Sequence, residues 1–296
     1  MDIGFAIIKG LVQGLTEFLP VSSTAHLIFT ETLLKRFGLF QGAISLTEAE
    51  AFDVLLHIGT LAALFAYFCR DVADWAKNPL QNRTLRLLMI SLMVTTILVL
   101  GVMHTSEAVF SAAGWDKTFG VRDLSEFYRS DFRWVAFHLT ITGVILFWIE
   151  SRVTQKSTQE AAIFTPDMIA HMPIKNALVI GLFQTLAAIF HGISRSGSTI
   201  TGGMLSGLSR LAATRYAFML GIPTFMAAAL YEGLKVSKHL DWSTLHWQPM
   251  VIGTLVSAVV GYSCVAFFVN FVAKHSLKPF AYYCWGAVLA MFWLMG

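Results

Sequence analysis

Two otherwise apolar stretches of the sequence, about 3–34 and 174–208, carry polar side chains whose types and spacing could do chemistry. In the first stretch, Glu17 and His26 flank a polar break, where neither side chain easily reaches water. Gln13 precedes Glu17 by one helical turn, so the two side chains share a helix face. Ionisable groups within apolar segments are costly, which makes them functional candidates. The hydroxyl groups next to them are those of Ser22, Ser23 and Thr24.

The second stretch has an arginine, Arg195, set between serines and glycines at the expected start of a helix. Its guanidinium presents a planar fork of donors, and the free N–H groups of a helix start add to the attraction for an anion. The pattern predicts a phosphate-binding loop, and a purely structural tie between two helices is the weaker interpretation. His191 is a lesser candidate whose role stays open. The hydroxyls around the arginine are those of Ser194, Ser196 and Thr199.

Together these groups predict phosphate chemistry on a lipid, because the anion site is flanked by apolar sequence. A serine would attack phosphorus, with Glu17 or His26 as the base and Arg195 stabilising the charge on the phosphoryl oxygens. A divalent cation held by Glu17 and a pyrophosphate would do similar electrostatic work. The residues alone leave open which hydroxyl attacks, whether water does, and whether His26 only packs.

Other polar or reactive side chains of the apolar segments receive structural interpretations. Lys9 and Glu31 lie near the ends of the first stretch and are expected to extend to the membrane surface. The cysteines show no metal-binding spacing and are expected to pack within the membrane. They are Cys69, Cys264 and Cys284.

The composition predicts an all-α polytopic membrane protein. Of the 296 residues, 56% are hydrophobic and 13% are charged, against about 25% charged in soluble domains. The net charge of +3 is too small and too dispersed for a nucleic-acid partner. A spanning helix needs about 20 mostly apolar residues. Six segments meet this requirement, at about 48–69, 84–104, 132–150, 211–232, 249–273 and 279–296.

The two polar-interrupted stretches are expected to form re-entrant helix–loop–helix hairpins. Their breaks fall at Pro20–Thr24 and His191–Gly197, and broken backbone is tolerated in a membrane only where protein covers it or a cavity adjoins it. Residues 1–296 are thus expected to form one membrane domain.

The two halves of the domain are expected to be inverted repeats. The Gly-Leu-Val-Gln at 10–13 recurs as Gly-Leu-Phe-Gln at 181–184. The first repeat, 1–150, and the second, 174–296, each contain a hairpin followed by three spans. A unit with three spans reverses its orientation when repeated, so the two hairpins should meet near the middle of the bilayer.

Lysine and arginine in the loops indicate the orientation. The more basic face is expected to be cytoplasmic, which puts both termini and the first hairpin's open end outside. The 105–131 connection is then an extracytoplasmic loop, with a short surface helix as one option.

The motifs resemble those of the bacterial undecaprenyl-pyrophosphate phosphatases of the bacitracin-resistance type. Residues 13–26, Gln-Gly-Leu-Thr-Glu-Phe-Leu-Pro-Val-Ser-Ser-Thr-Ala-His, are similar to the first signature of that family. Residues 192–199, Gly-Ile-Ser-Arg-Ser-Gly-Ser-Thr, are similar to the second, and 52–61 match a further stretch. The resemblance covers most of the chain in the same order.

The resemblance implies hydrolysis of the C55 isoprenoid pyrophosphate to the monophosphate carrier of peptidoglycan synthesis. It also implies a divalent cation, Mg²⁺ or Ca²⁺, and activity on the outer face of the bacterial cytoplasmic membrane. Carried over by residue, it assigns an acidic metal motif, the Ser-Ser-Thr-x-His group with Ser23 as the nucleophile, and a phosphate loop. The acidic motif is Gln13 and Glu17; the Ser/His group includes Ser22, Ser23, Thr24 and His26; the loop includes Ser194, Arg195, Ser196 and Thr199.

Two departures from the family pattern stand out. Gln13 occupies a position where many members have Glu, so metal binding must depend more on Glu17 and on substrate oxygens. His191 stands where the family usually has Pro.

A lipid-phosphate transporter or flippase is the alternative function, because inverted repeats with broken helices are also a transporter architecture. The combination of Glu17, Ser23 and His26 favours the enzyme, since a carrier needs only an anion site. The expected partners are the polyprenyl pyrophosphate substrate and membrane lipid. The oligomeric state is left open, with a homodimer as one alternative.

Overall fold

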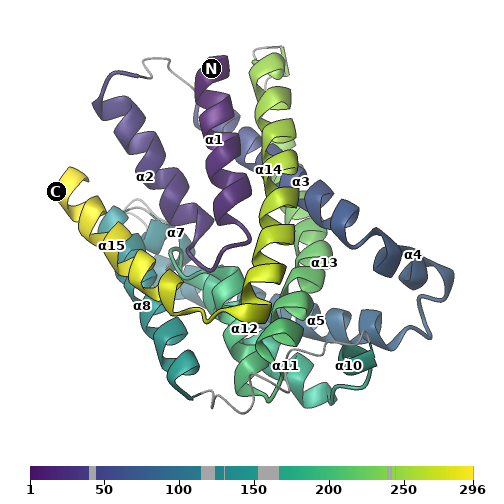
Figure 1. Cartoon of the computed structure of the whole chain (residues 1–296). Coiled ribbons are helices and arrows are strands. Elements are labelled where there is room, and N and C mark those ends of the chain that lie inside the picture. Colours follow the sequence, from purple (N-terminus) through teal and green to yellow (C-terminus); the bar gives the residue numbers. More distant parts are fainter. Residues whose placement is uncertain are drawn as a thin grey trace.

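The computed structural model describes all residues except 40–44, 115–123, 130, 153–166, 239, 241, 244 and 296. The described residues form helices joined by turns, without strands (Figure 1). In chain order the helices are α1 (Ile3–Thr16), α2 (Ser23–Arg36), α3 (Leu46–Tyr67), α4 (Cys69–Lys77), α5 (Arg83–Ala112), α7 (Leu124–Arg129), α8 (Phe132–Arg152), α10 (Asp167–Ala170), α11 (Ile174–Ile189), α12 (Arg195–Leu205), α13 (Arg210–Ser237), α14 (Trp247–Lys274) and α15 (Lys278–Met295).

In the described part of the chain, five helices are long and apolar enough to cross a membrane, which indicates a multi-pass membrane protein and confirms the all-α fold class. They are α3, α5, α8, α13 and α14, and they correspond to the first five predicted spans. The sixth predicted span corresponds to α15, which does not meet the same criterion. That α15 crosses the membrane therefore stays a prediction.

The two interrupted stretches form helix pairs, α1–α2 and α11–α12, with breaks slightly different from those expected. In the first pair the turn ends at Ser22, whose side chain caps α2 by accepting the Ala25 N–H at 3.4 Å. In the second, Ser194 caps α12 by accepting the Gly197 N–H at 3.1 Å. Figure 1 shows the pairs opening toward opposite ends of the molecule with their turns near its middle. The turns touch, because Ser196 Oγ donates to the Leu19 carbonyl at 3.0 Å.

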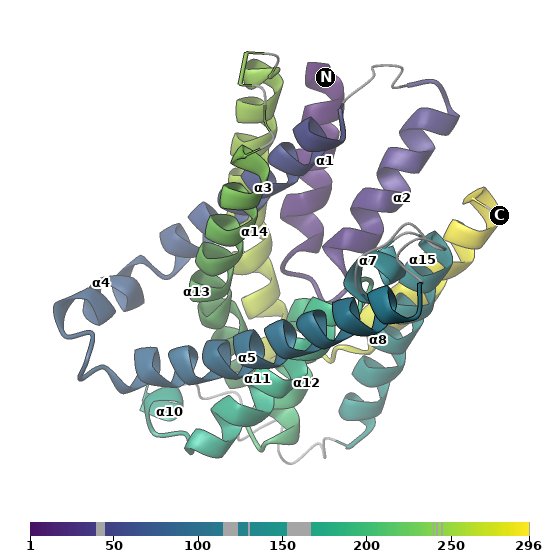
Figure 2. The same ribbon diagram turned by 180° about the vertical axis from the view of Figure 1, so that it is seen from behind.

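Each hairpin packs its first helix against a long helix of the other half of the chain. Helix α1 lies along α14, and α11 lies along α5, which Figure 2 shows from behind. Glycines allow the close approach in both places. A Cβ on Gly10 would lie 2.4 Å from the Gly253 carbonyl oxygen, and one on Gly181 would lie 2.7 Å from the Ser91 carbonyl oxygen. The backbones of these helix pairs are therefore in direct contact.

Gly10→Ala is expected to lower the free energy of unfolding by about 1–3 kcal/mol, because the added methyl group forces α1 away from the α14 backbone. Gly101→Ala is the matched control, since that helical glycine has open space around it. The control should be neutral or slightly stabilising. Unfolding in detergent, followed by circular dichroism, measures the difference, and equal stability of the two variants would contradict the contact.

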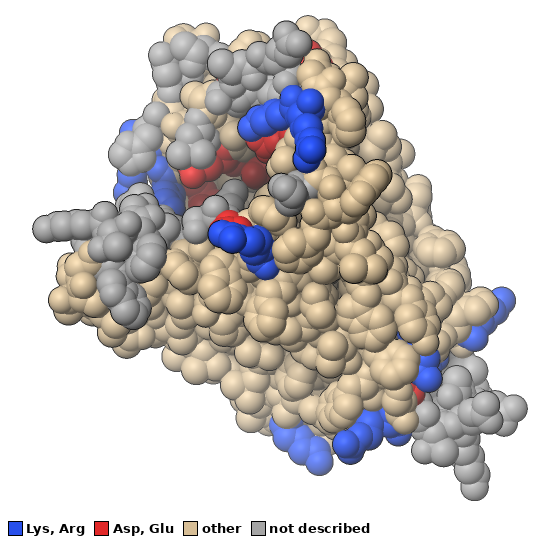
Figure 3. Space-filling view, turned by 90° about the vertical axis from the view of Figure 1, so that its left-hand side faces the viewer, with Lys and Arg blue, Asp and Glu red and all other residues tan. Residues whose placement is uncertain are grey.

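Lys9 does not extend to the membrane surface, so that prediction is wrong. The side chain is buried, and its Nζ lies 2.8 Å from Asp53 Oδ1 and 3.7 Å from Glu31 Oε2. Helix α3 brings Asp53 next to α1, and pairing removes the cost of a lone buried charge. Glu31 is partly exposed and also pairs with Lys35 at 2.8 Å. Figure 3 shows acidic side chains in a hollow at the end of the molecule that carries the N-terminus, rimmed by Lys and Arg.

A second buried ion pair, which the sequence does not indicate, joins Arg210 and Glu150. Arg210, the first residue of α13, is buried and contacts Glu150 through two nitrogens, at 2.6 and 2.8 Å. Glu150 also accepts the Leu277 N–H at 3.0 Å. The pair joins α8, α13 and the connection before α15, and it lies apart from the hairpin turns.

The predicted 105–131 connection is partly outside the described residues, at 115–123 and 130. Its described part continues α5 as far as Ala112 and includes the short helix α7. A short helix in this connection is therefore confirmed.

Candidate active site

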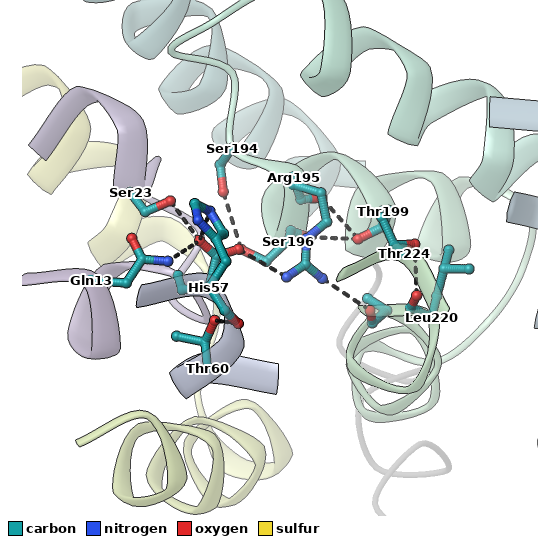
Figure 4. A network of polar contacts seen from close by, with 12 residues as sticks. Gln13, Ser23, His57, Thr60, Ser194, Arg195, Ser196, Thr199, Leu220 and Thr224 are labelled. Carbon is teal, nitrogen blue, oxygen red and sulfur yellow. Dashed lines mark hydrogen bonds and ion pairs between the residues drawn. The ribbon is translucent and has the colours of Figure 1, made fainter. Parts of the chain in front are cut away.

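A pocket of about 140 Å³ lies where the two hairpin turns meet. Its apolar wall includes Phe225 and Ile193, and its polar wall combines groups from both hairpins and from α3. The polar and charged lining residues are Thr16, Glu17, Ser22, Ser23, Thr24, His57, Ser194 and Arg195. In Figure 4, Gln13, Ser23 and His57 approach from one side and Ser194 and Arg195 from the other.

Glu17 is the centre of the polar contacts. It is buried, with 6% of its surface exposed. Its Oε2 accepts the Ser23 hydroxyl at 2.7 Å and the Gln13 Nε2 at 3.0 Å. Its Oε1 accepts Arg195 Nη2 at 3.0 Å. The structure thus joins Glu17, Ser23 and Arg195, three predicted site residues from two hairpins, in one network.

Arg195 is held in place by contacts on several sides. Its Nη1 donates to the Ala217 carbonyl at 3.2 Å, and the guanidinium carbon lies 4.5 Å from the centre of the Phe225 ring. Stacking on an aromatic face fixes the plane of the guanidinium. Its Nε is buried and has no hydrogen-bond partner among the described residues. The arginine therefore keeps unused donor capacity beside the pocket.

The hydroxyls of the second hairpin divide into two groups. Ser194 lines the pocket, as expected for a phosphate ligand. Ser196 does not line it, because its Oγ donates to the Leu19 carbonyl across the hairpin contact. Thr199 lies inside α12 and donates to the Arg195 carbonyl at 2.9 Å. These two hydroxyls stabilise the loop that carries Arg195.

His26 is placed away from the pocket. Its Nδ1 lies 2.8 Å from the Ser22 carbonyl oxygen and its Nε2 lies 2.8 Å from the Tyr283 hydroxyl. Both ring nitrogens are therefore engaged outside the Glu17 network. Ser22 and Thr24, from the same motif, do line the pocket. His191 contributes its carbonyl oxygen, which accepts His138 Nδ1 at 2.8 Å, and a chemical role for its side chain stays open.

The chain matches the model of the family described as bacitracin resistance protein BacA over residues 6–290. The chain belongs to this family. Proteins named undecaprenyl-diphosphatase are similar to it over almost their whole length. One from Trichlorobacter lovleyi is 35% identical and covers 100% of this chain and 98% of its own. One from Geotalea daltonii is 36% identical over 96% of this chain and 94% of its own, and one from Thermobifida fusca is 35% identical over 96% and 87%. The resemblance expected from the motifs is confirmed.

His57 also lines the pocket of this BacA-family protein, although its sequence motif did not predict it as a site residue. Its Nδ1 donates to the Asp53 carbonyl at 2.7 Å, which leaves Nε2 facing Glu17 Oε2 at 3.8 Å. A signal was present, because His57 lies within the 52–61 stretch that resembles the family.

His57→Asn is expected to lower kcat about 10-fold or more, because the pocket loses a nitrogen that faces Glu17 and can relay its proton. His275→Asn, at an exposed end of α14, is the control and should leave turnover unchanged. Steady-state phosphate release measures both, and full activity of the first variant would remove His57 from the site.

The donor set of the pocket suits a hard cation only in part. Among the described residues, no group of three His, Cys, Asp or Glu side chains could hold a metal. Gln13 Oε1, however, is buried beside Glu17 and has no hydrogen-bond partner within the described ranges. A carboxylate and an amide oxygen fit Mg²⁺ or Ca²⁺ when water and phosphate oxygens complete the shell.

Proposed function

We propose that this protein hydrolyses undecaprenyl pyrophosphate to undecaprenyl phosphate and inorganic phosphate, recycling the lipid carrier for peptidoglycan synthesis. Family membership and the names of full-length relatives support this activity. The observation that carries it is the shared contact at Glu17, which accepts the Ser23 hydroxyl on one oxygen and Arg195 on the other. A hydroxyl, a base and a phosphate-binding arginine thus lie together in one buried pocket.

In the proposed reaction, Ser23 Oγ attacks the terminal phosphorus, and its proton passes to Glu17 Oε2 along the existing hydrogen bond. A phosphoserine ester forms as the bond between phosphorus and the bridging oxygen breaks, and undecaprenyl phosphate leaves. Water then hydrolyses the ester, which releases inorganic phosphate and restores the serine. Arg195, with Ser194 beside it, stabilises the charge on the transferred phosphoryl group.

A divalent cation, Mg²⁺ or Ca²⁺, is proposed to bind between Glu17, Gln13 Oε1 and the pyrophosphate. When bound, it would neutralise charge on the phosphate oxygens. Gln13 supplies a neutral oxygen, so among the described residues that line the pocket Glu17 is the one carboxylate that would contribute to this site.

The proposed arrangement in the bacterial inner membrane has six spans, with α15 as the sixth, and two re-entrant hairpins from inverted repeats covering 1–150 and 174–296. The first helix of each hairpin packs on a long helix of the other half of the chain, α1 on α14 and α11 on α5, and this symmetry supports the inverted repeat. The open end of the first hairpin lies at the end with the N-terminus, and we place it on the periplasmic side. The pocket would then receive the pyrophosphate from that side.

The test is phosphate release from farnesyl or undecaprenyl pyrophosphate by the purified protein, with and without chelator. Ser23→Ala should abolish release, and acid quenching of wild type should trap labelled phosphoserine that this variant lacks. Ser151→Ala, an exposed serine at the end of α8, is the control. Full release by Ser23→Ala would exclude the serine nucleophile. No release by folded wild type that still binds lipid phosphate would favour the transporter.

A further inference from the structure

Ser22, the residue before the proposed nucleophile, has a backbone conformation that residues with a side chain rarely adopt. Its φ is 67°, and no other non-glycine residue in the described part of the chain has a positive φ. Such a conformation persists only where the surrounding structure holds it. Ser22 ends the hairpin turn and Ser23 begins α2, so this conformation determines where the Ser23 hydroxyl points.

His26 holds the Ser22 carbonyl from one helical turn away. Its backbone N–H lies 3.3 Å from that oxygen and its imidazole Nδ1 lies 2.8 Å from it. The Ser22 side chain contributes a longer bond, 3.4 Å from the Ala25 N–H. The imidazole thus makes the shortest of these contacts and fixes the direction of the Ser22 carbonyl.

Tyr283, on α15, holds His26 in turn. Its hydroxyl lies 2.8 Å from His26 Nε2, and the two rings are stacked with an interplanar angle of 11°. A carbonyl oxygen only accepts, so the neutral imidazole carries its proton on Nδ1 and its lone pair on Nε2. Tyr283 then donates to Nε2. This second hydrogen bond stabilises the tautomer and holds the ring in the orientation that binds the Ser22 carbonyl.

Helix α15 is packed against the turn at this point. Cys284 is fully buried, in a cluster with Val21 and Ala25. Tyr283 itself is half exposed, so its hydroxyl is the polar part of a contact that α15 presents to the hairpin. Residues far apart in the chain therefore support the Ser22–Ser23 turn.

We propose that Tyr283 is a positioning residue for the phosphatase reaction and acts through His26 on Ser22 and thereby on Ser23. The inference rests on the proposed function. In this arrangement, His26 does not take the Ser23 proton, because its Nε2 accepts from Tyr283 and its Nδ1 donates to the Ser22 carbonyl. The Ser23 hydroxyl contacts Glu17 instead.

Tyr283→Phe tests the relay because it removes the hydroxyl and keeps the ring. We expect kcat to fall about 10-fold with KM unchanged, since substrate contacts remain while the nucleophile loses its fixed orientation. Tyr282→Phe is the matched control on the same helix, where the ring contacts Phe147 and Trp285 and is exposed. The control should keep both constants. Equal kcat in Tyr283→Phe and wild type would overturn the proposal.

Two further measurements separate positioning from general support of the fold. In a His26→Gln background, Tyr283→Phe should add no further loss of kcat, because the relay is already broken. Additive losses would contradict action through His26. NMR of protein with ¹⁵N-labelled histidine should show His26 protonated on Nδ1 in wild type, with the Nε2 resonance shifted in Tyr283→Phe because its hydrogen bond from the tyrosine is lost. An unchanged Nε2 resonance would refute the relay even if wild type released no phosphate, an outcome that would separately reject the proposed function.

Discussion

Arg195→Lys is expected to lower kcat about 100-fold or more in phosphate release, although the positive charge is kept. The guanidinium reaches Glu17, the Ala217 carbonyl and the face of Phe225 at once, and a lysine ammonium has no planar fork to do this. Loss of one preorganised donor to a transition-state oxygen typically costs about 10²–10³ in kcat. Steady-state kinetics with a soluble polyprenyl pyrophosphate measure the effect.

Arg152→Lys serves as the control, because that arginine is exposed at the end of α8, stacks on Trp148 and lies outside both hairpins. It should retain wild-type turnover. If Arg195→Lys also retained full turnover, the planar donors would have no part in catalysis and the arginine would act only as a charge.

The two-hairpin site could be predicted because its motifs combine costly groups with helix breaks. Glu17 and Arg195 lie far apart in the sequence, and each one alone within an apolar segment requires a partner. The structure joins them at 3.0 Å. Their contact follows from the predicted position of both helix breaks near the middle of the fold. The pattern of hydrophobic and polar residues is enough to indicate that position.

The directions of the side chains could not be predicted in the same way. His26 and Ser23 belong to one motif, yet His26 turns toward α15 and Ser23 toward Glu17. The positive φ of Ser22 sets the direction in which α2 starts and so orients both side chains, and serine gives no sequence signal for that conformation as glycine would.

Buried ion pairs could not be predicted from the sequence either. Lys9 is predicted to reach the membrane surface because it lies near an end of the first apolar stretch, and the sequence indicates no partner for Arg210. Their partners, Asp53 and Glu150, come from helices distant in sequence. Only the tertiary arrangement brings these charges together, so the pattern of a single segment does not predict the pairs.

Glu17→Gln is expected to have opposite effects on turnover and on binding. Removing the base should lower kcat about 10²–10⁴-fold, because the amide no longer accepts the Ser23 proton. In the presence of chelator, the same change removes the negative charge beside Arg195, so the affinity of the pocket for inorganic pyrophosphate should rise. Glu107→Gln, at the exposed end of α5, is the control for general effects of removing a carboxylate. The two kinetic constants, measured together with the affinity for inorganic pyrophosphate, distinguish the alternatives. A higher KM with unchanged kcat would mean that Glu17 serves only in binding the substrate and that another group accepts the proton.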